Sequence, residues 1–178
     1  MGGHFPADEW LGVHAKSIGF IFLAGFLLAG STGMWAVWTG QESEGFALLL
    51  LCAGFAHNVE EWLVTRLLWG DEWVYTNWLY RAGWTFSVKS TLIKHLLCPL
   101  LLFTPFILNV HDERLWLLIV FYMNDQAATG AWQFGLGIAQ DGAAPGMISG
   151  VLLTFPAAIF ASYVRVEAAL DPCVHGSS

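Results

Sequence analysis

Charged residues are scarce in this chain of 178 residues: 7 are Lys or Arg and 14 are Asp or Glu, together 12% of the sequence. A soluble domain carries about 25% charged residues, so the chain has roughly half of what a water-facing surface needs. Hydrophobic residues make up 56% and aromatic residues 15%, which excludes a disordered chain. A net charge of −7 offers nucleic acid no basic surface. The composition therefore predicts a small integral membrane protein.

Cysteine is also sparse, and Cys52, Cys98 and Cys173 form no CxxC pair. We interpret Cys52 and Cys98, which lie in apolar runs, as buried free thiols. The sequence has no GxGxxG, GxSxG or P-loop motif, so it lacks these nucleotide-binding and nucleophile patterns. The first 16 residues are acidic rather than basic, with Asp8 and Glu9, which argues against a cleavable signal peptide.

Five stretches are apolar enough to be interpreted as transmembrane helices, since about 20 mostly apolar residues cross the hydrocarbon core. They are residues 17–39, 46–69, 91–108, 115–138 and 146–164. We expect an all-α integral membrane protein: a five-transmembrane-helix bundle. The bundle forms a single domain (17–170) between a polar N-terminal segment (1–16) and a short tail (171–178). The Trp-rich loop at 70–90 is expected to lie along the headgroup interface. The few basic residues slightly favour a cytoplasmic N-terminus.

Polar residues fall at membrane depth in the second, third and fourth of these stretches: His57, Glu60, Glu61, Lys94, His95, Asn124, Asp125 and Gln126. Glu60 and Glu61 follow His57 by three and four residues, so a helix places both carboxyl groups near the imidazole. A charge at the bilayer centre costs roughly 2.5–3.5 kcal/mol. We therefore expect these side chains to face one another inside the bundle, where Lys94 can offset one carboxylate.

Three interpretations compete for this polar cluster. It can be a network of polar side chains that holds the helices in register, although one interhelical polar pair stabilises a membrane protein by only about 0.6 kcal/mol. It can be a metal site built from His57, Glu60, His95 and Asp125, but di-metal bundles repeat the HxxE unit that occurs once here. We therefore expect no tightly bound metal. We favour the third interpretation, in which a carboxylic acid that keeps its proton in an apolar pocket works with a histidine on an apolar ligand. No cofactor is expected.

A family resemblance points the same way. The stretch FAHNVEEWLV, with His57, Glu61 and Trp62, resembles the second helix of the emopamil-binding (EXPERA) membrane proteins, a sterol isomerase-like family. CPLLLF at 98–103 is similar to the Pro-Leu segment of that family's third helix, and Pro156 to a proline in its fifth. The resemblance extends over residues 46–170 and includes a glutamine in the fourth helix. It implies a five-helix fold with His57 and Glu61 as an acid–base pair.

The chain departs from the family pattern at two places. Where the isomerase has a second glutamate in the third helix, this sequence reads VKSTLIKH and supplies Lys94 and His95. Small or apolar residues around Ser149 and Leu152 replace the Asn and Trp of the fifth helix. Only the first acid–base pair therefore matches. The string HNVEE also resembles the HXXEE membrane family, whose motif lies nearer the N-terminus.

Taken together, we expect a multi-pass membrane protein with an intramembrane polar pocket for a sterol-like or isoprenoid lipid. The expected catalytic residues are His57 and Glu61. Glu61 protonates an alkene carbon of the lipid, and His57 orients Glu61 or returns a proton to it. The expected ligand-binding residues are Glu60, Trp62, Lys94, His95, Asn124, Asp125 and Gln126. The alternative is a non-catalytic subunit of a larger membrane complex that holds lipid, pigment or quinone. The sequence leaves open whether the chain forms a homo-oligomer or joins such a complex.

Overall fold

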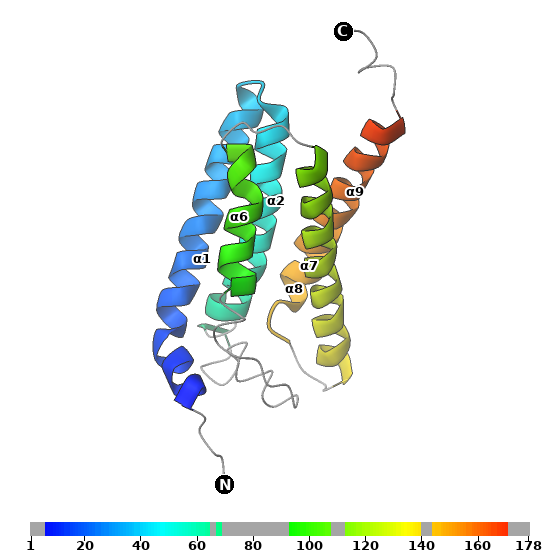
Figure 1. The fold of residues 1–178 in the computed structure, drawn as a ribbon. Coiled ribbons are helices and arrows are strands. Elements are labelled where there is room, and N and C mark those ends of the chain that lie inside the picture. Colours follow the sequence, from blue (N-terminus) through cyan, green and yellow to red (C-terminus); the bar gives the residue numbers. More distant parts are fainter. Residues whose placement is uncertain (1–5, 65–66, 69–92, 108–112, 140–143, 171–178) are drawn as a thin grey trace.

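The computed structural model describes residues 6–64, 67–68, 93–107, 113–139 and 144–170, and all regular structure within these parts is helical. Long helices lie side by side in an elongated bundle (Figure 1). The predicted all-α class is confirmed for the described residues. The predicted interfacial loop at 70–90 and the C-terminal tail at 171–178 lie outside them.

The first two helices form an antiparallel hairpin. Helix α1 (Pro6–Trp38) turns directly into α2 (Glu42–Val59), and the Gln41 amide closes the turn with a 2.8 Å hydrogen bond to the Ala36 carbonyl. Small residues of α1 let α2 approach closely: an added Cβ at Gly25 would lie 3.0 Å from the Phe55 ring. Helix α2 is the central helix, packed against α1 on one side and against α6 and α7 on the other.

The second half of the chain supplies the helices α6 (Cys98–Ile107), α7 (Glu113–Ala139), the short α8 (Met147–Ser149) and α9 (Phe155–Leu170). Of these, α7 and α9 pack together on the side of α2 away from α1, while α6 lies nearer the hairpin (Figure 1). Residues 147–170 form one continuous run of helix, called here the last run of helix. Helix α7 crosses it at Gly130 and Gly150, where a Cβ added to either residue would lie 2.5 Å from the Cα of the other. The two backbones can approach this closely because neither residue has a side chain.

Within the described residues, three π-helical turns adjoin these helices: η1 (Glu60–Val64), η3 (Ile93–Leu97) and η4 (Gly150–Thr154). Such turns are rare and are often found at functional sites. Here η1 extends α2, η3 precedes α6, and η4 joins α8 to α9. Two of the three contain buried ionisable residues, Glu60 and Glu61 in η1 and His95 in η3.

Among the described residues, three helical segments are long and apolar enough to cross a membrane: Lys16–Trp38, Glu42–Val64 and Met147–Val164. They correspond to the first, second and fifth predicted spans. The third predicted span is described only over residues 93–107, which is shorter than the roughly 20 residues that a crossing needs. In the fourth, Asn124, Asp125 and Gln126 interrupt the apolar run of α7. The structure thus supports a membrane protein.

Candidate functional site

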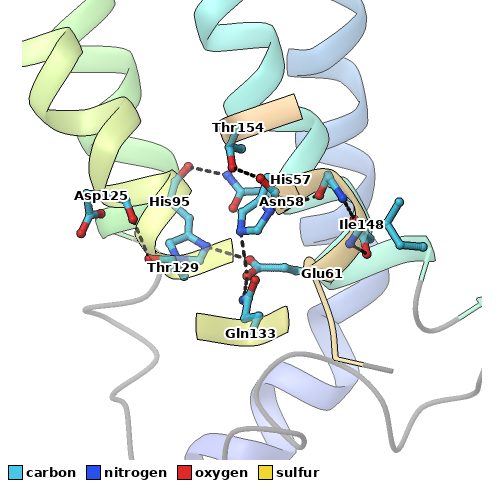
Figure 2. Close-up of polar contacts among 12 residues, drawn as sticks. His57, Asn58, Glu61, His95, Asp125, Thr129, Gln133, Ile148 and Thr154 are labelled. Carbon is cyan, nitrogen blue, oxygen red and sulfur yellow. Dashed lines mark hydrogen bonds and ion pairs between the residues drawn. The ribbon is translucent and has the colours of Figure 1, made fainter. Parts of the chain in front are cut away.

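Glu61 lies at the centre of a buried polar cluster formed by four elements (Figure 2). Its Oε1 accepts a 2.6 Å hydrogen bond from Gln133 Nε2 on α7 and lies 3.4 Å from His57 Nε2 on α2. Its Oε2 lies 3.3 Å from His95 Nδ1 on η3. The side chains of Glu61, His57 and His95 are at most 3% exposed. One carboxyl group therefore faces an imidazole at each of its oxygens, away from water.

Two adjacent glutamates of η1, Glu60 and Glu61, are both buried, and they face different neighbours. In an α-helix, neighbouring side chains diverge by about 100°, so one of the pair normally turns outward. The Glu60 amide bonds the carbonyls of Ala56 and His57, so it still has α-helical bonding, and the π-helical turn begins at this residue. Glu61 faces α7 and η3, whereas Glu60 faces the start of α8.

Glu60 holds the backbone at the start of the last run of helix. Its Oε1 accepts the Ile148 amide at 3.0 Å, and its Oε2 accepts the Ser149 amide at 2.6 Å. A carboxylate suits this place because the first amides of a helix lack intrahelical partners and carry partial positive charge. The Ser149 side chain in turn reaches the cluster, with Oγ 3.1 Å from His57 Nδ1.

The chain enters this last run through a buried turn at residues 144–146 that packs against the cluster. Gly146 has φ of 79°, in the left-handed region that residues with a Cβ rarely adopt. An added Cβ there would lie 2.6 Å from both Gln133 Oε1 and His57 Cε1. The turn therefore closes one side of the site, and it can do so because the residue is glycine.

The structure brings together three of the predicted site residues, His57, Glu61 and His95, and places Glu60 beside them. Three of the remaining predicted residues, Trp62, Asn124 and Asp125, lie elsewhere. Trp62 is fully buried in the apolar core, with its ring centroid 6.4 Å from that of Phe22.

Two predicted residues on α7 do not join the Glu61 cluster. Asn124 is exposed and donates to the Val120 carbonyl and, at 3.3 Å, to Ser162 Oγ on α9. Asp125 is half-buried and lies apart from Glu61 (Figure 2). The third α7 residue, Gln126, is buried. The side chain of Lys94 lies outside the described residues, so its predicted pairing with a carboxylate stays a prediction.

Sequence reasoning left three contributors out of the predicted site: Gln133, Ser149 and Asn58. Gln133 is fully buried and follows the predicted Gln126 by seven residues, two helical turns, so the spacing could have placed both on one face. Asn58 donates a 3.2 Å hydrogen bond to the His95 carbonyl and ties η3 to α2. Ser149 carried no comparable signal, because its contact with His57 depends on the buried turn that precedes it.

The polar groups of the site contact one another. Within the described residues, no group of three or more His, Cys, Asp or Glu side chains is arranged to hold a metal ion. The metal content of the protein stays a prediction. What the arrangement offers chemically is one carboxyl group and two imidazoles between which a proton can move.

No protein-family model matches the chain, and comparison with curated proteins and with solved structures finds no significant match. The resemblance to the emopamil-binding family therefore rests on the short motifs given above.

Proposed function

We propose that the chain is a multi-pass integral membrane protein with five spans, and that Glu61, His57 and His95 form an acid–base centre acting on an apolar lipid. The lipid is sterol-like or isoprenoid, and the reaction moves a carbon–carbon double bond. The observation that carries the proposal is the placement of an imidazole at each oxygen of the buried Glu61 carboxyl group. Intramembrane ionisable groups are costly and typically mark functional sites.

The five-span arrangement is supported by the two faces of α7. Its 27 residues extend over about 40 Å, more than the roughly 30 Å of a hydrocarbon core. Its polar residues Gln126 and Gln133 are buried, whereas Phe121 is 75% exposed and Leu117 is 51% exposed. A helix of low mean hydropathy can cross a membrane when its polar face is turned into the bundle in this way.

The proposed reaction conserves protons and electrons. Glu61 transfers its proton to one alkene carbon, whose π electrons form the new C–H bond and leave a positive charge on the adjacent carbon. A neighbouring carbon then releases a proton to one of the two imidazoles, and its C–H electrons become the shifted double bond. His57 and His95 orient the carboxyl group and return the proton to it. The cycle needs no oxidant, reductant or cofactor.

The test is conversion in deuterated water. The protein, reconstituted in phospholipid vesicles, is incubated with a panel of monounsaturated sterols and isoprenoid alcohols, and products are analysed by mass spectrometry. The expected product has a shifted double bond and one deuterium per molecule. Glu61→Gln should lower the rate by about 100-fold or more, the scale of a lost general acid. Glu42→Gln, at an exposed position at the start of the same helix, should leave the rate unchanged.

Three outcomes bear on the proposal. Conversion that depends on Glu61 supports it. Conversion that persists in Glu61→Gln contradicts the role assigned to the carboxyl group. Lipid that copurifies with the protein and is never converted contradicts catalysis and favours the non-catalytic lipid-holding subunit instead.

A further inference from the structure

Glu60 is only 7% exposed, yet its carboxyl group is directed to backbone amides rather than to the Glu61 cluster. Both of its oxygens accept hydrogen bonds, at 3.0 Å from Ile148 and at 2.6 Å from Ser149. The two oxygens are thus each occupied by a backbone amide, which orients the carboxyl group toward the chain at 148–149. Glu60 is therefore suited to holding the chain rather than to acting as a second acid.

The residue that Glu60 holds is also the residue that contacts the catalytic pair. Ser149 offers its amide to Glu60 and places its hydroxyl oxygen 3.1 Å from His57 Nδ1. The other ring nitrogen of His57, Nε2, faces Glu61 Oε1 at 3.4 Å. A line of contacts thus runs from Glu60 through Ser149 and His57 to Glu61.

The partners of Glu61 Oε1 select one tautomer of His57. This oxygen already accepts the Gln133 amide, so it acts as an acceptor whether Glu61 is ionised or carries its proton on Oε2. A nitrogen that faces an acceptor is stabilised when it bears the hydrogen, which places the His57 proton on Nε2. Nδ1 is then the acceptor, and the Ser149 hydroxyl is the group that can donate to it.

We propose that Glu60 is a positioning residue: by holding the Ser149 backbone it keeps the Ser149 hydroxyl on His57 Nδ1 and so fixes His57 in the tautomer whose Nε2–H faces Glu61. The catalytic meaning of this tautomer rests on the proposed function, but the tautomer itself does not. The two adjacent glutamates thus have different roles, Glu61 as the acid and Glu60 as the group that orients its histidine.

Nitrogen NMR of the full-length protein in detergent micelles tests the proposal directly. With ¹⁵N-labelled histidine, the ring signals of His57 are those that disappear in His57→Gln, and their shifts report which nitrogen bears the proton. We expect a single tautomer with the proton on Nε2 in the unchanged protein. Ser149→Ala, which keeps the amide bonded to Glu60 but removes the hydroxyl, should give a mixture of tautomers. Glu60→Gln should do the same, because an amide has one acceptor oxygen in place of two.

Two further variants separate positioning from general stability. Ser149→Thr retains a hydroxyl and should restore the single tautomer, and Glu42→Gln should leave it unchanged. A single Nε2–H tautomer that persists in both Ser149→Ala and Glu60→Gln would overturn the proposal. If Glu60→Gln does not fold, the comparison of Ser149→Ala with Ser149→Thr decides. Because the readout needs no substrate, a failure here is distinct from a failure to find lipid conversion.

Discussion

Gln133 donates its side-chain amide to Glu61 across 2.6 Å, although the two residues are 72 positions apart in the sequence. The contact joins α7 to the π-helical end of α2 at the point where the buried carboxyl group needs a donor. Gln133 is fully buried, so water cannot replace it if it is removed. The pair is therefore a sensitive place to test whether the cluster is formed as described.

Replacing Gln133 by methionine should destabilise the protein. The substitution keeps the length of the side chain but removes the donor, and leaving a buried acceptor without its donor costs about 1–3 kcal/mol. We expect a free energy of unfolding lower by that amount in a detergent titration. Gln41→Met changes an exposed glutamine at the start of α2 and should have little effect. Equal stability of the two variants would show that Gln133 does not support Glu61.

A side chain at Gly130, where α7 crosses the last run of helix, should destabilise the protein. A Cβ there would lie 2.5 Å from the Cα of Gly150, so Gly130→Ala forces two backbones apart. Overpacking of this kind costs about 1–3 kcal/mol. The matched control is Gly135→Ala on the same helix, where a Cβ would meet nothing within 4 Å. That change should stabilise α7 by up to about 1 kcal/mol, because alanine is the better helix former.

The two variants are compared by thermal unfolding monitored by circular dichroism. The prediction requires a lower midpoint for Gly130→Ala and an equal or higher midpoint for Gly135→Ala. If both midpoints shift in the same direction, the close approach of the two helices does not account for the effect of Gly130→Ala.

The sequence alone predicted the all-helical class and the burial of the polar residues on the second helix. Both follow from local rules, since apolar runs of sufficient length form helices in lipid and charges avoid it. The pairing of His57 with Glu61 was also within reach, because residues four apart on a helix are neighbours. His95 could be placed at the site because a second deep ionisable group needs a partner.

The rest of the site depends on features that sequence periodicity does not encode. The partners of Glu60 are the amides of Ile148 and Ser149, far along the chain, so helical spacing could not assign them. Asn124 was expected at the site but turns to Ser162, a contact set by how α7 and α9 pack. Ser149 reaches His57 only because a buried turn precedes it. Such long-range contacts follow from the assembled fold.

Metal analysis of the purified protein addresses the alternative chemistry of the cluster. The single HxxE unit offers few ligands, and the imidazoles of His57 and His95 face the Glu61 carboxyl group. We expect no stoichiometric zinc, iron or copper in a washed, detergent-purified sample measured by plasma mass spectrometry. Addition of a chelator should leave the thermal midpoint unchanged. One equivalent of metal that resists washing, with a midpoint that falls on chelation, would favour a metal site instead.

The last prediction concerns Gly146, where two physical effects can be separated by a control within the same chain. Gly146 and Gly40 share a left-handed backbone, with φ of 79° and 84°. A Cβ at Gly40 would meet nothing within 4 Å, whereas at Gly146 it would lie 2.6 Å from His57 Cε1. Gly40→Ala therefore measures the backbone strain alone, about 1–2 kcal/mol.

Gly146→Ala adds to that strain the displacement of His57 and Gln133, so it should destabilise the protein by more than Gly40→Ala does. It should also change the His57 ring signals in the nitrogen NMR spectrum, which Gly40→Ala should leave in place. Unfolding titrations and spectra of the two variants, recorded side by side, provide the measurement. Equal destabilisation with unchanged His57 signals in both would mean that the turn at 144–146 does not pack against the cluster. In that case the turn would also not account for the contact between Ser149 Oγ and His57 Nδ1.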